Sequence, residues 1–342
     1  MKQEKLLTIT IPAYNAQNYL ERCIVSMTKT SRKDKTEILI INDGSTDATG
    51  AMAEKYAGQY EGIVKVIHKE NGGHGSAINT GIAHATGTYF KVVDADDWVD
   101  EAAYDAFLEK LEGAACDLVA TPFTCVYVDK DGNVVSGAKG NVQYRRIEGC
   151  DGLERGKEYD FREHASNLHV RMHEWTIKTE LLRQHGITLF EHCFYVDMQY
   201  ILFPVPWIRT FCVFDLPVYC YRIGSQGQSV SRENMQRNRA QHNRVLQSVV
   251  KYYREREALG DSKSVLAYLA NGIAKMQADE IKTLLSMPVC AKSRREIKEL
   301  ESWLMTECKE AYDANPKKSV WLLRKSRYLL YPVAAILLRL VK

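Results

Sequence analysis

The stretch FKVVDADDW, residues 90–98, decides how the first part of this chain is interpreted. It opens with an apolar, β-branched run typical of a buried strand and ends in Asp94, Asp96 and Asp97 without an intervening turn residue. Carboxylates packed this closely raise each other's pKa or recruit a cation. The end of this strand therefore predicts a site at which positive charge comes from another group.

The first 130 residues alternate between strand-like and helix-like patterns, which is typical of an α/β fold with a mainly parallel central sheet. Ser45 or Thr46 is expected to cap the helix after the second strand, and Asp100 a later helix, because such side chains accept hydrogen bonds from free helix N–H groups. The expected strands cover residues 6–11, 37–42, 63–68 and 88–93. The acidic stretch therefore follows the fourth strand.

The remainder of the chain changes from strands to helices. Residues 118–147 alternate like strands around the turn signal Asp131-Gly132, and 208–222 are also expected to form strands, after a short helix near 179–184. After Ser231 the apolar spacing is helical. The predicted domains are an α/β domain at 1–230 with halves 1–100 and 101–230, a helical region at 231–313, and a tail at 314–342.

The tail, residues 314–342, carries seven Lys or Arg and no acidic residue, mixed with aliphatic side chains, Trp321, Tyr328 and Tyr331. This composition is typical of a segment that lies on a membrane surface. The apolar run 328–338 is shorter than the roughly 20 residues that a spanning helix needs. We therefore expect peripheral membrane contact, with an amphipathic helix packed on the body of the protein as the alternative.

Composition limits the remaining classes of function. A net charge of +3 over 342 residues is too small to indicate nucleic-acid binding by itself. Nine cysteines without a CxxC pattern indicate a reducing compartment, and the N-terminus lacks the apolar run and cleavage site of a signal peptide. The expected location is the cytoplasm, with contact at the inner face of the plasma membrane.

Four stretches that follow expected strands are unusually rich in polar and small residues. In parallel α/β sheets the ligand lies at the carboxyl ends of the strands, so these stretches are the candidate site. They are PAYN (12–15), NDGSTD (42–47), ENGGHGSAINTG (70–81) and DADD (94–97). The glycines at 72, 73 and 75 could let backbone approach a phosphate, but the chain lacks GxGxxG after its first strand and lacks GxxxxGK[ST]. This counts against dinucleotide-binding and P-loop enzymes.

The acidic residues in these stretches suggest two kinds of contact. Asp94 and Asp96, one residue apart, could hold Mg²⁺ or Mn²⁺, which in turn bridges a diphosphate; a solvated acidic turn before a helix is the alternative. The Asp43 carboxylate could accept the ring N–H of a base such as uracil, or it could simply favour the N-terminus of the next helix.

Taken together, the order and spacing of the four stretches resemble the family 2 glycosyltransferases, of the GT-A fold, over roughly residues 5–230. The resemblance implies a metal-dependent, inverting enzyme that uses Mn²⁺ or Mg²⁺. It would move a sugar from a nucleoside-diphosphate sugar, with a UDP-sugar expected, to a hydroxyl of a glycan or lipid-linked acceptor in cell-surface polysaccharide synthesis.

The resemblance also assigns roles to individual residues. Asp96 is the expected direct metal ligand, with Asp94 beside it, and Asp43 matches the base-reading aspartate. Asp197, in FEHCFYVDMQY (190–200), matches the acid that serves as catalytic base, and the nearby Glu191 is the rival for that role. The residues assigned to the nucleotide sugar are Pro12, Ala13, Tyr14, Asn15, Asp43, Gly72, His74, Asp94, Ala95 and Arg222.

Three positions depart from the pattern of relatives. Asn42 stands where many have Asp, Ile78 where many have a phosphate-binding Arg, and Val196 where a Glu usually precedes the base. His74 is a candidate substitute for the missing arginine. The departures keep open a non-catalytic sugar-nucleotide-binding protein, while a sugar nucleotidyltransferase would be expected to carry a GxGxR-like loop where PAYNAQ stands.

Two further assignments have alternatives. Arg222 and Ser229 could contact phosphate, but Arg222 could equally form a structural ion pair. His169 and His173 are four residues apart, but no third ligand lies at the spacing of a zinc site, so a polar loop facing the acceptor is expected there.

Overall fold

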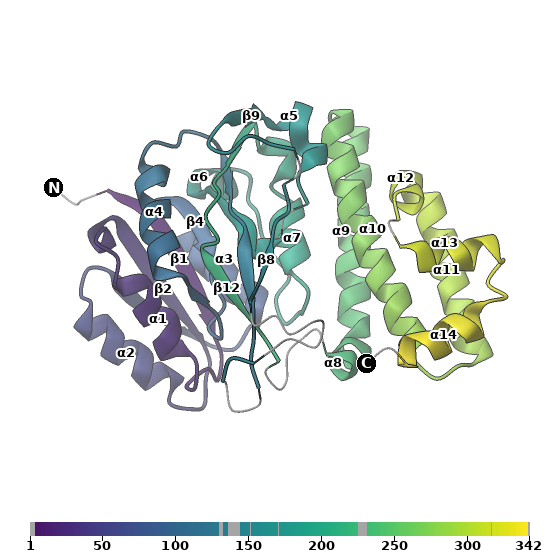
Figure 1. Cartoon of the computed structure of the whole chain (residues 1–342), viewed down its shortest axis with the longest axis horizontal. Helices are drawn as coiled ribbons and strands as arrows, with labels where there is room; N and C mark the ends of the chain where they lie inside the picture. Colours follow the sequence, from purple (N-terminus) through teal and green to yellow (C-terminus); the bar gives the residue numbers. More distant parts are fainter. Residues whose placement is uncertain are drawn as a thin grey trace. The chain divides into compact units, whose positions relative to one another are not determined.

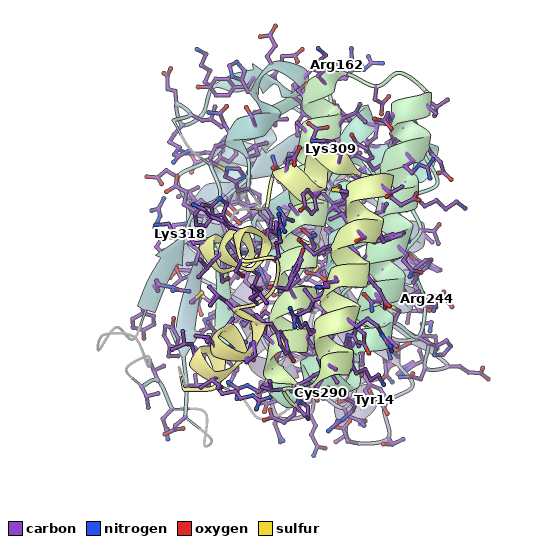
Figure 2. The ribbon with its side chains drawn as sticks, turned by 90° about the vertical axis from the view of Figure 1, so that its right-hand side faces the viewer. Tyr14, Arg162, Arg244, Cys290, Lys309 and Lys318 are labelled. Carbon is purple, nitrogen blue, oxygen red and sulfur yellow. The ribbon has the colours of Figure 1, made fainter. Side chains whose placement is uncertain are left out.

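The computed structural model describes residues 4–129, 133–135, 144–150, 152–169, 171–224, 231–315 and 317–340. The chain forms two compact units, Met1–Gln226 and Gly227–Lys342 (Figure 1), and Figure 2 shows the side chains. The turn expected at Asp131-Gly132 and the expected contact of Ser229 lie outside the described residues.

An eight-stranded sheet forms the centre of the first unit, in the order β3-β2-β1-β4-β10-β6-β11-β9. Its strands are β1 Lys5–Ala13, β2 Thr36–Asp43, β3 Val64–Lys69, β4 Gly87–Val92, β6 Leu118–Ala120, β9 Glu158–Asp160, β10 Trp175–Lys178 and β11 Thr210–Val213. The strands β1 to β4 pair in parallel, whereas β10 is antiparallel to both of its neighbours. All four strands expected in the first 100 residues are confirmed, each within two residues of its expected ends.

A second, four-stranded sheet in the same unit has the order β5-β12-β7-β8. Its strands are β5 Trp98–Val99, β7 Phe123–Tyr127, β8 Tyr144–Ile147 and β12 Tyr219–Ile223. β5 pairs antiparallel with β12 through Trp98 and Cys220. Residues 94–97 therefore connect the two sheets, because β4 ends just before them and β5 begins just after them.

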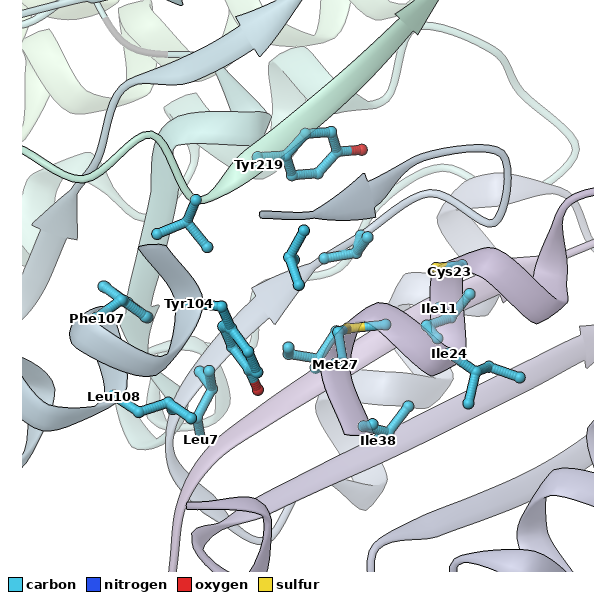
Figure 3. Packing of buried hydrophobic residues seen from close by; sticks show 14 of the residues in the cluster. Leu7, Ile11, Cys23, Ile24, Met27, Ile38, Tyr104, Phe107, Leu108 and Tyr219 are labelled. Carbon is cyan, nitrogen blue, oxygen red and sulfur yellow. The ribbon is translucent and has the colours of Figure 1, made fainter. Parts of the chain in front are cut away.

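Helices cover both faces of the large sheet. They are α1 Leu20–Thr28, α2 Thr49–Gln59, α3 His74–His84, α4 Glu101–Glu112, α5 Phe161–His164, α6 Thr179–Gln184 and α7 Asp197–Leu202, with single 3₁₀ turns η1 Lys33–Lys35, η2 Ala165–Asn167, η3 Met172–Glu174 and η4 Val205–Trp207. Alternate β1 residues such as Leu7 and Ile11 pack with Met27 of α1 and Tyr104 of α4 (Figure 3). Successive strand residues point to opposite faces, so Leu39 and Ile41 of β2 lie on the other face and pack against Ala77 of α3.

The expected helix caps were correct in one case and wrong in the other. Asp100 caps α4, since its side chain accepts a hydrogen bond from the Ala103 backbone N–H. The helix expected after Ser45 or Thr46 instead begins at Thr49. The backbone N–H groups of Ser45 and Thr46 donate to the side-chain oxygens of Asn42 (3.2 Å) and Asn15 (2.9 Å), so these two residues form a loop after β2 that is hydrogen-bonded to Asn15, beyond β1.

The second unit is helical in all its described elements. They are α8 Arg232–Arg237, α9 Arg239–Ala258, α10 Lys263–Ser286, α11 Ala291–Glu307, α12 Lys309–Asp313, α13 Lys318–Lys325 and α14 Tyr331–Leu340. The long helix α10 packs against α8, α9, α11, α12 and α14, which makes it the centre of this unit. Among the described residues, every helix is too short or too polar to cross a lipid bilayer.

Candidate active site

All four candidate stretches lie at one edge of the large sheet, because β3, β2, β1 and β4 are neighbouring and parallel. Pro12 and Ala13 are the last two residues of β1 and are buried, while the Tyr14 side chain is 54% exposed. The Asn15 backbone N–H donates to the Ser45 hydroxyl at 3.1 Å, which joins the first two stretches directly. The expected gathering of strand ends is therefore present, and nucleotide contact by these residues stays a prediction.

Asp43, the last residue of β2, organises the loop after β3. Its Oδ1 accepts hydrogen bonds from Lys69 Nζ (2.8 Å) and the Gly72 N–H (2.9 Å), and its Oδ2 accepts one from the Gly73 N–H (2.7 Å). A carboxylate offers about four acceptor positions, so these contacts leave one for another donor. Reading of a base by Asp43 stays a prediction, and its first role is to shape the loop.

Two glycines of that loop permit a close approach within the chain itself. Gly73 has φ +83°, a backbone conformation that favours glycine, and a Cβ at Gly75 would lie only 2.2 Å from the carbonyl oxygen of Phe190. The His192 N–H donates to the Gly72 carbonyl oxygen at 2.5 Å. The sequence suggested that these glycines let the backbone approach a phosphate. In the structure they instead make room for residues 190–192, in the segment that leads to Asp197.

His74, the first residue of α3, reaches across to the acidic stretch. Its Nε2 lies 2.8 Å from Oδ1 of Asp94. Burial alone would lower the pKa of His74, but the charge of Asp94, helped by Asp197 and Asp96, raises it overall. Ile78, one helical turn later, is fully buried. Position 78, where the resemblance leads us to expect arginine, therefore belongs to the core, and His74 is the side chain of α3 that reaches Asp94.

The other two carboxylates differ in their surroundings. Asp97 is 2% exposed and accepts hydrogen bonds from the Tyr219 hydroxyl (2.5 Å) and the Arg222 N–H (2.7 Å), so it ties the stretch to β12. Burial, followed by the charge of Asp94, raises the pKa of Asp96 to about 6. The protein alone therefore makes ionisation of Asp96 less favourable than it is in water, and a bound cation would favour it.

His173 joins this group, although the sequence favoured a polar loop over a metal site at this residue. One ligand atom each of Asp94, Asp97 and His173 lies within 4.8 Å of the others, a cluster that does not include Asp96. Among the described residues, the buried Nδ1 of His173 has no hydrogen-bond partner. Burial lowers the pKa of His173 to about 4, which leaves the neutral imidazole that binds metals. These observations fit a divalent cation beside Asp94, while ligation by Asp96 stays a prediction.

Lys91 was also missed, because it sits within an apolar run. It is fully buried in β4, and its Nζ donates to the carbonyl oxygens of His173 (2.8 Å) and Trp175 (3.3 Å). Burial lowers the pKa of Lys91 to about 7. The lysine holds the η3 turn against β4 and thereby positions His173. A single charged residue inside an otherwise apolar strand was the signal that could have identified it.

Asp197 is the first residue of α7. The preceding His192 and Tyr195 have φ of +50° and +65°, so the chain turns sharply before the helix. Val196, where relatives have Glu, is buried. The charge of Asp197 acts on His74, so the two side chains face the same region, whereas Glu191 is exposed in the preceding loop.

Arg222 of β12 contacts the backbone of the acidic stretch. Its Nε donates to the backbone carbonyl oxygen of Asp96 at 2.8 Å. Its guanidinium lies 4.8 Å from the ring centre of Tyr19 and 5.4 Å from that of Trp98. The side chain is therefore held in place by contacts within the chain, and contact with a phosphate stays a prediction.

Comparison with known sequences gives a clear family match. Residues 8–171 match the family model described as glycosyl transferase family 2. The uncharacterized glycosyltransferase EpsJ of Bacillus subtilis is 41% identical over 118 residues, which cover 34% of this chain and 34% of EpsJ. The chain thus matches about a third of the length of that relative.

Comparison with solved structures supports the fold. Staphylococcus aureus TarS aligns with a TM-score of 0.62 and 17% identity over 96% of this chain and 54% of that chain. TarS 1–349 in complex with UDP-GlcNAc aligns with a TM-score of 0.54 and 15% identity, over 94% of this chain and 92% of that chain. A Pyrobaculum calidifontis mannosyltransferase in complex with GDP-Man and Mn²⁺ aligns with a TM-score of 0.50 and 16% identity, over 99% of this chain and 88% of that chain. At these identities the likeness confirms the expected GT-A fold with a helical C-terminal region.

Proposed function

This chain belongs to glycosyl transferase family 2, and from that premise we propose that it is a metal-dependent, inverting glycosyltransferase. Its donor would be a nucleoside-diphosphate sugar, with UDP as the nucleotide, and its acceptor a hydroxyl of a glycan or lipid-linked precursor of a cell-surface polysaccharide. The UDP-GlcNAc bound by TarS 1–349 supports the donor. Nine free cysteines support a cytoplasmic location.

The observation that carries the proposal is the convergence of charge at one end of the sheet. The acidic stretch after β4, the His74 imidazole of α3 and the Asp197 carboxylate of α7 come from separate elements, and the charges of Asp94, Asp197 and Asp96 all raise the pKa of His74. Such groups of mutually perturbed side chains are typical of catalytic sites. A plain acidic turn would need neither the half-buried His74 nor the carboxylate of α7.

The metal would be Mn²⁺ or Mg²⁺, held by Asp94 and Asp96, with His173 available as a further ligand. The cluster of Asp94, Asp97 and His173, with the unpartnered buried Nδ1 of His173, supports a cation beside Asp94. When bound, the cation would neutralise the charge of the diphosphate. The Mn²⁺ found with the archaeal mannosyltransferase supports the same choice.

The chain's own residues would carry out the transfer. Asp197 would accept the proton of the acceptor hydroxyl while that oxygen forms its bond to the anomeric carbon of the sugar. The bond from that carbon to the diphosphate breaks as the nucleoside diphosphate leaves with the electron pair. Attack from the face opposite the leaving group inverts the anomeric centre. The protonated His74 would supply positive charge in place of the arginine replaced by Ile78.

The experiment that tests the function measures nucleotide release from a panel of UDP-sugars and GDP-sugars, with Mn²⁺ and with EDTA. We expect Mn²⁺-dependent release of the nucleoside diphosphate from one donor. UDP with Mn²⁺ should also raise thermal stability, since a ligand at 100 times its Kd stabilises the native state by about 2.7 kcal/mol.

Two other results would contradict the proposal. Formation of a nucleotide sugar and pyrophosphate from a nucleoside triphosphate and a sugar 1-phosphate would identify a sugar nucleotidyltransferase. Stabilisation by UDP without release from any donor, even with candidate acceptors, would identify a sugar-nucleotide-binding protein. Because the three classes differ in product, one chromatographic separation of the nucleotides distinguishes them.

A further inference from the structure

The last two helices of the second unit leave one apolar face uncovered. Of thirteen large hydrophobic side chains exposed among the described residues, seven lie in α13, α14 and the turn between them. These seven define what we name the α13–α14 surface: Trp321, Leu322, Leu329, Leu330, Val333, Ile336 and Leu337. A concentration of this kind on a protein surface marks a binding face.

The uncovered face belongs to helices that are firmly packed on their other side. Leu323 of α13 and Tyr331 of α14 are buried in a cluster with Leu284 of α10 and Ile297 of α11. In α14, Val333, Ile336 and Leu337 follow the i, i+3, i+4 spacing of one helical face, opposite to Tyr331. The buried side of α13 and α14 thus holds the exposed side chains in place. The sequence offered an amphipathic helix packed on the protein as the alternative to membrane contact, and these helices combine such packing, against α10 and α11, with an exposed apolar face.

The turn between the helices presents the most exposed of these side chains. Arg327 and Tyr328 adopt φ of +49° and +63°, the left-handed region that non-glycine residues seldom occupy. The Tyr328 hydroxyl donates to Glu301 at 3.0 Å, which fixes the turn on α11. Leu329, the next residue, is 72% exposed. The chain therefore maintains a strained turn that holds a leucine in the solvent.

The charged side chains that the segment 314–340 itself carries have one sign. Lys317, Lys318, Lys325 and Arg327 are exposed, and none of them forms an ion pair within the described part of the chain. Lys318, labelled in Figure 2, begins α13. Acidic residues are absent from the whole sequence after Asp313. A surface that combines apolar side chains with uncompensated positive charge is complementary to a negatively charged lipid bilayer.

A basic hollow lies beside the surface. Its volume is about 300 Å³, and its lining is Lys298, Ser302, Tyr312, Arg324, Arg327 and Tyr328. Arg324 is committed to Glu301 and to the Tyr312 carbonyl oxygen, whereas Lys298 lies over the Tyr328 ring. The hollow therefore offers ammonium, guanidinium and hydroxyl groups to a phosphate-bearing lipid headgroup next to a surface that would contact acyl chains.

We propose that the α13–α14 surface docks the protein onto an anionic lipid bilayer without crossing it. The apolar side chains enter the headgroup region, and the surrounding lysines contact lipid phosphates. The proposal does not depend on the reaction assigned to the first unit. It does suit an acceptor that is itself attached to lipid, because docking would confine the enzyme to the layer in which that acceptor lies.

The test is flotation of the full chain with vesicles of phosphatidylcholine, alone or mixed with phosphatidylglycerol. We expect the wild type to float with the mixed vesicles and much less with phosphatidylcholine alone. The double variant Leu329→Ser, Leu337→Ser should bind at least about tenfold more weakly, since each exposed leucine contributes buried area in the bilayer. Leu259→Ser is the matched control, because Leu259 is 71% exposed but lies at the end of α9.

A second pair of variants separates charge from apolar contact. Lys318→Gln with Lys325→Gln should remove most of the preference for anionic vesicles, while Lys251→Gln, at an exposed position of α9, should not. Equal flotation of the leucine double variant and the wild type would overturn the proposal, as would failure of the wild type to bind anionic vesicles. Light scattering that shows a wild-type dimer and a monomeric leucine variant would overturn it in favour of a contact between two copies.

Two measurements keep the result separate from folding and from catalysis. Thermal unfolding should be nearly the same for all these variants, because the altered side chains are exposed. Nucleotide release from a water-soluble donor should also be unchanged. A variant that loses flotation and keeps both properties supports docking whether or not the proposed transfer reaction is correct.

Discussion

The acidic stretch after β4 and the α13–α14 surface depart from the usual distribution of side chains in opposite directions. Asp97 is 2% exposed although it is acidic, and Leu329 is 72% exposed although it is apolar. Buried polar groups and exposed apolar patches are the informative exceptions in a folded protein. Each region has an arrangement that a partner outside the chain would stabilise.

The two regions differ in how far the chain itself compensates for the exception. Asp94 is hydrogen-bonded to His74, and Asp97 accepts hydrogen bonds from Tyr219 and the Arg222 N–H. Asp96 and the Nδ1 of His173 therefore have fewer hydrogen-bond partners. The aliphatic side chains of the α13–α14 surface form no hydrogen bonds, so the strength of their binding depends on the apolar area that is buried. We therefore expect binding of defined stoichiometry at the acidic stretch and graded binding that depends on lipid composition at the surface.

The largest expected effect concerns the base beside the acidic stretch. Asp197→Asn should reduce sugar transfer by about 10²- to 10⁴-fold, the typical contribution of a positioned general base. Binding of UDP with Mn²⁺ should stay normal, because the groups assigned to the donor lie on other elements. Steady-state rates and calorimetry of the same preparation measure both quantities. Glu191→Gln, in the exposed loop, is the control; if it loses activity and Asp197→Asn does not, the base is Glu191.

Next in size is the loss of metal-dependent binding. Asp96→Asn should weaken binding of UDP in the presence of Mn²⁺ by about 10- to 100-fold, as removal of groups around a metal typically does. Asp100→Asn removes an equal charge nearby, yet asparagine keeps the helix cap, so it should bind normally. Calorimetry decides between the two sets of ligands. Normal binding by Asp96→Asn together with weak binding by His173→Asn would assign the metal to Asp94, Asp97 and His173.

A smaller effect should come from the buried charge of Lys91. Because burial lowers its pKa from 10.5 to about 7, the folded state holds fewer protons than the unfolded state between these values. Stability contributed by this group is therefore lost as pH falls toward 7 and regained toward pH 10.5, by up to about 1.4 kcal/mol per pH unit. Lys91→Met should lack this slope. Urea unfolding at several pH values would contradict the prediction if the two proteins changed in parallel.

The smallest expected effect is on the apolar surface itself. Leu337→Ser should change the free energy of unfolding by less than about 0.5 kcal/mol, because an exposed side chain stabilises little in the absence of lipid. Leu323→Ala, at a 1% exposed position of α13, should cost about 2–5 kcal/mol. Denaturant titration compares the two. A large cost for Leu337→Ser would mean that the side chain is packed and the surface is not free.

Local patterns in the sequence identified much of the fold. The four parallel strands followed from β-branched runs, and the cap at Asp100 from a polar residue just before a helical pattern. The caps at Ser45 and Thr46 were wrong, because the hydroxyls of both residues bind Asn15, which is about 30 positions earlier in the chain. Local propensity cannot register such a competing partner.

The candidate site was predictable in its position but not in its contacts. The ends of parallel strands meet by topology, so the polar stretches could be assigned to one edge before any contact was known. The proximity of His173 to Asp94 depends on how η3 packs under the buried Lys91, a contact between residues 82 positions apart in the sequence. Such pairings arise from tertiary packing and leave no periodic signal.

The contact between Gly75 and the Phe190 carbonyl oxygen also limits how this protein can change over evolutionary time. A side chain at position 75 would displace residue 190, and the displacement would pass along the short segment to Asp197. The loop before α3 and the segment before α7 can therefore diverge only by compensating pairs of substitutions. We expect them to be inherited as one unit, so that exchange of either loop alone between distant homologues would give an inactive chimera and exchange of both would not.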